Sequence, residues 1–128
     1  MYFSIDPSDG VPIYEQIVRQ VKYAVADKVL VGGQMVPSVR QLAQQLAINP
    51  NTIARAYQQL QSDRVLEGLR GKGLVVRSDA IRRCTKARDR LLADRLRGVL
   101  AEALQGGIAP DELRRLFDQH LQELTQPQ

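Results

Sequence analysis

A short polar stretch, Asn49 to Arg55, carries side chains that could read the edges of DNA bases. Asn51 and Thr52 follow Pro50, and Arg55 lies about one helical turn beyond them. An Asn amide matches adenine with two hydrogen bonds, an Arg fork matches guanine, and Thr can contact a base or a phosphate. In isolation, ordinary capping by Asn49 of a helix whose first turn faces water explains the same residues. The flanking elements favour DNA.

Ser38 and Arg40 lie at the start of another predicted helix, which a tight turn separates from the helix that begins after Asn49. Helix N-termini bind phosphate readily, so Ser38 is well placed for a DNA phosphate as well as for capping its own helix. Arg40 could form a bidentate contact with guanine or clamp a phosphate. A solvated surface arginine is the alternative for Arg40 and for Arg55.

A basic turn punctuated by glycine, Arg70-Gly71-Lys72-Gly73, separates two strand-like runs. Gly71 and Gly73 permit positive φ and a close approach to another backbone. Arg70 and Lys72 would carry positive charge to a neighbouring minor groove or phosphate backbone. A solvated charged hairpin is an equally good interpretation for either residue taken alone.

Three helices and a β-hairpin must position these side chains. Helical spacing of apolar residues predicts a first helix from about Pro12, which Gly32-Gly33 would end. The third helix turns Ile53 and Tyr57 inward and so leaves the base-reading side chains outside. Strands are predicted over residues 65–69 and 74–77, and Arg64 precedes them at a position that favours glycine. Two short helices, a tight turn and a basic hairpin form a winged helix-turn-helix, whose second helix enters a major groove.

From residue 79 onward the pattern becomes purely helical. Residues 80–105 form one long amphipathic helix, Gly106-Gly107 breaks it, and Pro110 starts another helix without a polar N-cap. We therefore expect a mainly α fold with a small β wing, made of a winged domain over residues 1–78 and a two-helix dimerisation hairpin over residues 79–128. Each helix of this short tail carries an apolar seam, and burial against a partner chain is the simplest way to remove both seams from water. The seams consist of Leu92, Leu96 and Val99, and of Leu113, Leu116, Phe117, His120, Leu121 and Leu124.

Composition narrows the class of protein. The 128 residues carry a net charge of +4, which weakly favours a polyanionic partner. One Cys and one His can neither form an internal disulfide nor assemble a zinc site, and Cys84 has no neighbouring base. We see no catalytic set, phosphate-cradling loop or cofactor motif, so we expect no enzyme, no metal and no cofactor. Without a secretion signal or a bilayer-spanning run, the expected location is the cytoplasm, with no membrane partner.

A second basic run lies at the start of the long helix and consists of Arg82, Arg83, Lys86, Arg88 and Arg90. Asp79, Asp89 and Asp94 interleave with it at helical spacings, as is typical of a solvated helix face. A supporting contact with the DNA backbone is the alternative.

Together these motifs resemble the GntR family of transcription regulators, and within it the small YtrA-like subfamily. The resemblance covers about three-fifths of the chain. It departs from the family pattern at Arg64, Gly68 and Leu74, where glycine, threonine and threonine are common. The matching residues, in order, are Ile5-Asp6, Pro12-Ile13-Tyr14-Glu15-Gln16-Ile17, Pro37-Ser38-Val39-Arg40, Asn49-Pro50-Asn51-Thr52, Ala56-Tyr57 and Arg70-Gly71-Lys72-Gly73.

The resemblance implies a homodimer that binds an imperfect palindrome in double-stranded DNA and represses its own operon, which in this subfamily often encodes an ABC transporter. The MocR-like group continues into a domain that holds pyridoxal phosphate, and other groups carry a sizeable ligand-binding domain. About fifty residues of helical hairpin are too few for either.

Two other functions fit the same pattern. The chain could be an adaptor whose winged domain and helical tail both bind proteins. It could also be a ligand-responsive regulator with a small-molecule effector, of unknown identity, in the cleft between dimerised tails. Salt separates the first alternative from DNA binding, because binding that releases counterions weakens steeply as salt rises.

Overall fold

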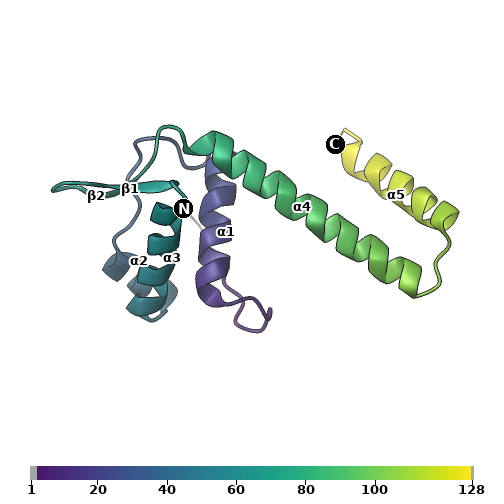
Figure 1. The fold of residues 1–128 in the computed structure, drawn as a ribbon, viewed down its shortest axis with the longest axis horizontal. Coiled ribbons are helices and arrows are strands. Elements are labelled where there is room, and N and C mark those ends of the chain that lie inside the picture. The colour runs from purple at the N-terminus through teal and green to yellow at the C-terminus, as the bar shows by residue number, and fades with distance from the viewer. Residues whose placement is uncertain (1–2, 128) are drawn as a thin grey trace. The chain divides into compact units, whose positions relative to one another are not determined.

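The computed structural model describes residues 3–127, which form five helices and one two-stranded antiparallel sheet (Figure 1). The mainly α fold with a small β wing is therefore confirmed. The chain divides into two compact units, one reaching to Asp89 and the other beginning at Arg90, and each is described by itself. The elements are α1 (Ile13–Ala26), α2 (Val39–Leu46), α3 (Pro50–Ser62), β1 (Leu66–Leu69), β2 (Gly73–Val76), α4 (Ala80–Gln105) and α5 (Pro110–Thr125).

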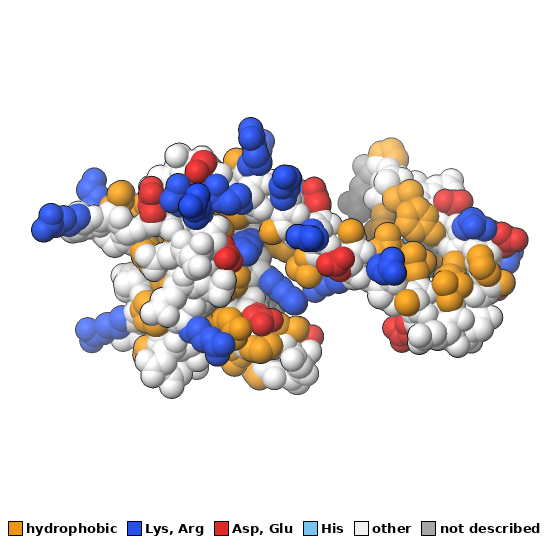
Figure 2. Space-filling model, viewed as in Figure 1, with side chains coloured by type: hydrophobic (Ala, Val, Ile, Leu, Met, Phe, Trp, Pro, Cys, Tyr) orange, Lys and Arg blue, Asp and Glu red, His pale blue; other side chains and the backbone are white. Residues whose placement is uncertain are grey.

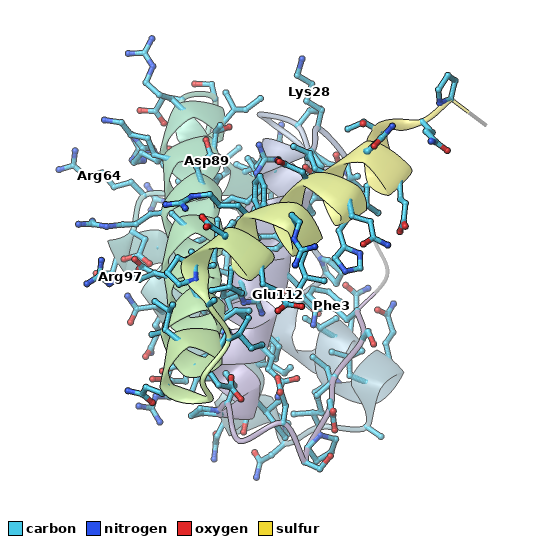
Figure 3. All side chains as sticks on the ribbon, turned by 90° about the vertical axis from the view of Figure 1, so that its right-hand side faces the viewer. Phe3, Lys28, Arg64, Asp89, Arg97 and Glu112 are labelled. Carbon is cyan, nitrogen blue, oxygen red and sulfur yellow. The ribbon has the colours of Figure 1, made fainter. Side chains whose placement is uncertain are left out.

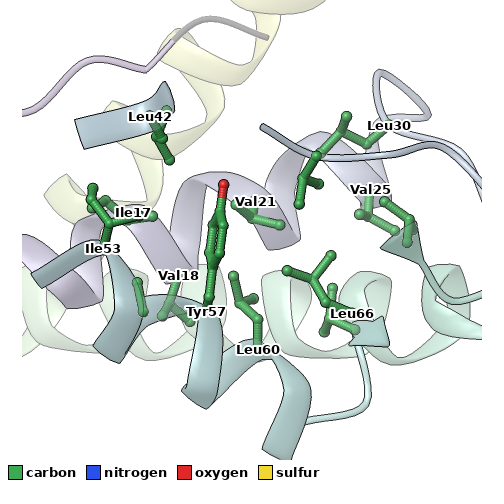
Figure 4. Close-up of a cluster of buried hydrophobic side chains, with 14 of the residues drawn as sticks. Ile17, Val18, Val21, Val25, Leu30, Leu42, Ile53, Tyr57, Leu60 and Leu66 are labelled. Carbon is green, nitrogen blue, oxygen red and sulfur yellow. The ribbon is translucent and has the colours of Figure 1, made fainter. Parts of the chain in front are cut away.

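The core of the first unit lies between α1, α2, α3 and the base of the hairpin (Figure 4). Ile17 of α1 and both Ile53 and Leu60 of α3 have no exposed surface, and Ile53 faces inward as the helical spacing predicted. Leu42 of α2 and Leu66 of β1 close the core from the other sides, each 1% exposed. Burial of this aliphatic set fixes the face that α3 turns inward, and therefore also the face that it presents to solvent.

α1 ends at Ala26, six residues before the predicted Gly32-Gly33 stop. Lys28 takes a positive φ of 62°, and the N–H groups of Val29 and Leu30 both donate to the carbonyl of Ala24, at 2.8 and 3.0 Å. The Leu30 side chain is 3% exposed in the core. The prediction was wrong because this hydrophobic contact and a left-handed cap by a non-glycine residue end the helix first.

The glycine pair has a different role. A Cβ on Gly32 would lie 2.8 Å from the Cα of Ser78, so the loop after α1 passes the end of β2 at a distance that only glycine allows. Gly33 takes a φ of 86° and donates its N–H to the carbonyl of Val76 at 2.8 Å. The pair therefore attaches the loop to the wing instead of capping α1.

Gln16 attaches the segment before α1 to the first unit, and it is the buried polar residue of the core region, 7% exposed. Its Oε1 accepts from the N–H of Asp6 at 2.8 Å, and its Nε2 donates to the carbonyls of Asp6 and Val11 at 2.7 and 2.9 Å. These bonds satisfy the buried amide and fix the lead-in segment against α1.

The two helices of the helix-turn-helix are capped as predicted. The Oγ of Ser38 accepts from the N–H of Gln41 at 3.1 Å, and the Gln41 Oε1 accepts from the N–H of Ser38 at 3.0 Å. The C-cap of α2 is Ala47, which takes a left-handed φ of 53°. Asn49 then caps α3, its Oδ1 accepting from the N–H of Asn51 at 2.8 Å. These local bonds explain why so short a turn joins the two helices.

The strands differ from the prediction by one residue: β1 begins at Leu66 instead of Val65, and β2 covers residues 73–76 instead of 74–77. Leu66 pairs with Val76 and Leu69 pairs with Gly73, so residues 70–72 form the tip. Gly71 and Gly73 take positive φ values of 79° and 108°, as the glycine pattern predicted. A glycine-tipped hairpin of this kind extends a narrow basic end away from the core.

The first turns of α4 pack with the winged domain. Ala80 is fully buried and Cys84 is 1% exposed. The Arg83 guanidinium donates to the carbonyl of Arg64, which ties α4 to the turn after α3. By its internal contacts the compact unit therefore includes α4 as far as Asp89, whereas composition alone places the domain boundary at residue 78.

The second unit, described from residue 90 to 127, is an antiparallel helical hairpin. α4 and α5 are joined by a turn in which Gly107 takes a φ of 91°, and Ala109 precedes α5 without a side-chain cap. None of the side chains from residues 90–127 is buried. Within residues 3–127, none of the helices combines the length and the hydrophobicity that crossing a bilayer requires.

Candidate nucleic-acid interface

The outer face of α3 carries the predicted base-reading residues. Asn51 and Arg55 are exposed and Thr52 is half-buried. Asn51 and Arg55 are four residues apart, so they lie above one another on the same helix face. The Oδ1 of Asn49 caps α3, so this residue shapes the start of the recognition face. The residue itself is exposed at that end of α3.

Arg55 is held by an aromatic ring that the sequence analysis did not assign to the site. Its guanidinium carbon lies 3.8 Å from the centroid of the Tyr14 ring, which comes from the first turn of α1. The Tyr14 hydroxyl donates to the Glu15 Oε1 at 3.2 Å. The spacing of residues within one helix carries no signal for a contact between two helices, so only the fold brings this pair together.

Ser38 and Arg40 stand exposed at the start of α2. Ser38 completes a capping box with Gln41, so the alternative of an ordinary N-cap is realised. Its hydroxyl hydrogen is not used in that box, and capping is compatible with donation to a phosphate. No ion pair involves Arg40 among residues 3–127, which leaves its guanidinium available to a nucleic acid.

The wing tip adds positive charge beside α2. Arg70, Gly71 and Lys72 are all exposed, and Figure 2 shows basic side chains at the end of the hairpin. A groove of about 440 Å³ lies between the wing and the start of α2, and its walls include Lys72 and Ser38. The fold therefore brings Lys72 of the wing and the N-terminus of α2, far apart in the sequence, to the walls of one groove whose other lining residues are mostly apolar.

Tyr57 supports this groove from the core side. Its hydroxyl donates to the carbonyl of Pro37 at 2.7 Å, directly before the N-cap of α2. Burial raises the pKa of Tyr57 to about 12, so the hydroxyl stays protonated and keeps donating throughout the physiological range. Tyr57 thus positions α2 on α3 and is not itself a titrating group.

The basic run at the start of α4 is partly neutralised inside the protein. Arg83 lies 2.8 Å from the Asp79 Oδ1, and Arg88 pairs with Asp27 at the end of α1. Hydrogen bonds from Arg83 and then from Arg77 hold the pKa of Asp79 well below its usual range. These contacts favour a structural role for Arg83 and Arg88.

Other chemistry finds little support in this unit. Burial raises the pKa of the Cys84 thiol and so disfavours a reactive thiolate. Within the described range, no group of three or more His, Cys, Asp and Glu side chains is arranged to hold a metal ion.

The predicted dimerisation residues are brought together in the second unit. Leu96 is 45% exposed and Phe117 is 48% exposed, values far too high for a folded core. A groove of about 480 Å³ between α4 and α5 is lined by all nine predicted residues except Leu92. His120 lines it as well, with its Nδ1 3.7 Å from the Glu123 Oε2. Figure 2 shows the apolar side chains gathered on this unit.

Comparison with known proteins gives consistent results. A family model described as bacterial regulatory proteins, gntR family, matches residues 13–76. The transcriptional repressor YtrA of Bacillus subtilis is 32% identical over 109 residues, which cover 85% of this chain and 84% of YtrA. A solved transcriptional regulator from Oenococcus oeni has a TM-score of 0.73 and 32% identity over 94% of this chain and 99% of its own. YtrA from Sulfolobus acidocaldarius has a TM-score of 0.58 and 26% identity over 97% of this chain and 100% of its own.

Proposed function

The chain belongs to the GntR family of bacterial regulatory proteins and is a DNA-binding transcriptional regulator, not an enzyme; on this premise we propose that it is a homodimeric repressor that binds an imperfect palindrome. Repression is supported by the Bacillus subtilis relative, which is a transcriptional repressor. The YtrA-like resemblance further supports an operon that includes the regulator's own gene and encodes an ABC transporter. Binding to chromosomal DNA would place the protein in the cytoplasm.

The observation that carries DNA reading is the polar stripe on the outer face of α3, where Asn51 and Arg55 are exposed and Thr52 is half-buried. We propose that this stripe enters the major groove, with Ser38 and Arg40 bracing from α2 and the wing residues Arg70, Gly71 and Lys72 from the side. Asn49 contributes by capping α3 and by its exposed amide. Support comes from the shared groove between wing and α2, because phosphate contacts fix the register in which base contacts can form.

The proposed dimer is supported by the second unit, which has large apolar side chains but no buried residue among those described. A helical hairpin with this composition is unstable alone in water, because burial of apolar surface is the main stabilising contribution to a helical unit. A second copy would cover the seams of Leu96, Phe117 and their neighbours. Two identical reading heads would then meet two half-sites about one helical turn of DNA apart.

Selection of bound genomic fragments tests the function, because it returns the operator and its neighbouring genes together. We expect a short imperfect palindrome upstream of the regulator's own operon. Affinity for it should fall by orders of magnitude between about 50 and 200 mM salt if each protein chain contacts several phosphates. Absence of any DNA retention at low salt would reject the repressor and favour the adaptor.

A pair of variants on α5, measured with the operator found above, tests the proposed dimer. Phe117→Asp places a carboxylate in the apolar groove and should give a monomer by light scattering, with much weaker operator binding. Gln122→Asp adds the same charge on the outer face and should stay dimeric. A Phe117→Asp protein that remains dimeric with full affinity would place the interface elsewhere.

A further inference from the structure

Tyr14 and Arg55 form a stacked pair between the first turn of α1 and the outer face of α3. The guanidinium carbon is 3.8 Å from the ring centroid, the distance of direct contact between a guanidinium plane and an aromatic face. The Tyr14 ring is half-buried, whereas Arg55 is exposed. The ring therefore forms part of the packed surface of the first unit, and the guanidinium lies on it at the edge of solvent.

A second contact fixes the register of the two helices. The Lys22 Nζ lies 2.9 Å from the Asp63 Oδ2, and these residues are 41 positions apart in the sequence, as are Tyr14 and Arg55. Equal separations at both contacts mean that α1 and α3 run side by side in the same direction (Figure 1). Together the two contacts fix how α1 lies along α3, and this holds the Tyr14 ring in place beside α3.

Stacking leaves the hydrogen-bonding edge of Arg55 unoccupied. A guanidinium binds a ring through its flat face, whereas its five N–H donors point outward in the plane. No ion pair involves Arg55 among residues 3–127, so no carboxylate competes for that edge. Arg55 also shares its helix face with Asn51, one turn nearer the start of α3.

We propose that Tyr14, which lies outside the helix-turn-helix, is a positioning residue for DNA recognition. Its ring holds the Arg55 guanidinium in the orientation in which the N–H edge meets a pair of oxygen or nitrogen acceptors on operator DNA, next to the base contacted by Asn51. The acceptors are those of a guanine edge or of a phosphate, which both match the planar fork. Holding a flexible arginine in its binding orientation raises affinity because less side-chain freedom is lost on binding. The proposal rests on the DNA-reading function proposed above.

Operator affinity of the full-length protein tests this in a double-mutant cycle made of Tyr14→Leu, Arg55→Ala and the combined variant. Arg55→Ala should weaken operator binding about ten-fold, the effect of one charge-assisted contact, and Tyr14→Leu about three- to five-fold. In the Arg55→Ala background, Tyr14→Leu should have no further effect, because the ring acts only through the guanidinium. Tyr14→Phe keeps the ring and should bind within about two-fold of the wild type.

Two controls separate positioning from folding and from net charge. Thermal unfolding of each variant ensures that binding is measured well below its unfolding midpoint. Lys28→Asn removes a positive charge at the opposite end of α1, at a positive φ that Asn tolerates, and should leave affinity nearly unchanged. If Arg55→Ala lowers affinity for the operator only, Arg55 contacts a guanine edge. If it lowers affinity for random DNA equally, Arg55 contacts a phosphate. The role of Tyr14 is supported in both cases.

Three results would overturn the proposal: an Arg55→Ala protein with unchanged affinity, a Tyr14→Leu loss that persists in full without Arg55, or a Tyr14→Phe loss as large as that of Tyr14→Leu. Failure of the proposed function looks different. In that case the wild-type protein itself would show no salt-dependent binding to DNA of any sequence.

Discussion

Arg83 of α4 donates a hydrogen bond to the backbone carbonyl of Arg64, the residue whose left-handed φ of 60° ends the turn after α3. The contact joins the end of the proposed recognition helix to the start of the helix that leads into the second unit. It uses the backbone of Arg64 only, and the Arg64 side chain extends outward into solvent (Figure 3). The position therefore has a conformational requirement that is separate from its side chain.

Replacement of Arg64 by glycine should stabilise the protein. A left-handed conformation costs a residue with a Cβ about 1–2 kcal/mol, and part of this is offset because glycine is more flexible in the unfolded chain. We expect the free energy of unfolding to rise by about 0.5–1 kcal/mol, which raises the melting temperature by a few degrees. Differential scanning calorimetry measures the change.

Gln61→Gly is the matched control for this substitution. Gln61 is exposed in the last turn of α3, where the backbone is helical, so glycine should lower the free energy of unfolding by about 1 kcal/mol there. A loss of stability at both positions would contradict the strain assigned to Arg64.

Asp79 should make the first unit sensitive to acid. Hydrogen bonds from Arg83 and Arg77 hold its folded-state pKa below the ordinary value of 3.8. A lowered folded pKa means that the carboxylate contributes stability above the unfolded pKa and loses that contribution as the pH falls through the folded pKa. The difference in melting temperature between wild type and Asp79→Asn should be largest near neutral pH and shrink below about pH 4. A difference that stays constant from pH 7 to pH 3 would show that the ion pairs contribute no pH-dependent stability.

The caps of α2 and α3 and the start of α5 were predictable because they depend on neighbouring residues. Ser38, Asn49 and Pro110 each act within one turn of their own position, and Arg64 takes the strained conformation that its place after a helix implies. The apolar spacing of α3 also placed its outward face correctly. Local rules suffice where the structure is decided within a few residues.

The parts that could not be predicted depend on residues far apart in the sequence. Lys28 ends α1 because Leu30 is drawn into a core built largely by other helices, and no local pattern reports that. The stacking of Arg55 on Tyr14 is likewise a property of how two helices pack. The inclusion of Cys84 in the core, which extends the first unit into α4, is a third case.

Gly32→Ala should destabilise the first unit even though Gly32 does not have a positive φ. The added methyl would lie 2.8 Å from the Cα of Ser78, a backbone atom that cannot move aside without shifting the end of β2. We expect a loss of roughly 1–3 kcal/mol in the free energy of unfolding, the usual cost of overpacking. Urea denaturation of the wild type and of Gly32→Ala measures this loss.

Gly98→Ala is the counterpart with the opposite sign. A Cβ on Gly98 meets no atom within 4 Å in the chain, and the residue lies inside α4. Alanine should therefore stabilise this helix by about 1 kcal/mol. Destabilisation at Gly98 would indicate that the partner chain of the proposed dimer packs closely against this glycine.

Arg40→Ala should reveal what the start of α2 contacts. If Arg40 reads a guanine, the substitution should weaken operator binding by roughly 1–3 kcal/mol and leave binding to random DNA nearly unchanged. Equal losses on both DNAs, with a salt dependence reduced by about one phosphate, would assign a backbone contact instead. Arg82→Ala is the matched control, because Arg82 is an exposed arginine in the basic run of α4. If Arg82 is only solvated, the substitution should not change affinity. A uniform loss of affinity on both DNAs would show that the basic run of α4 lies against the DNA backbone, and would extend the phosphate-binding surface from the helix-turn-helix onto α4.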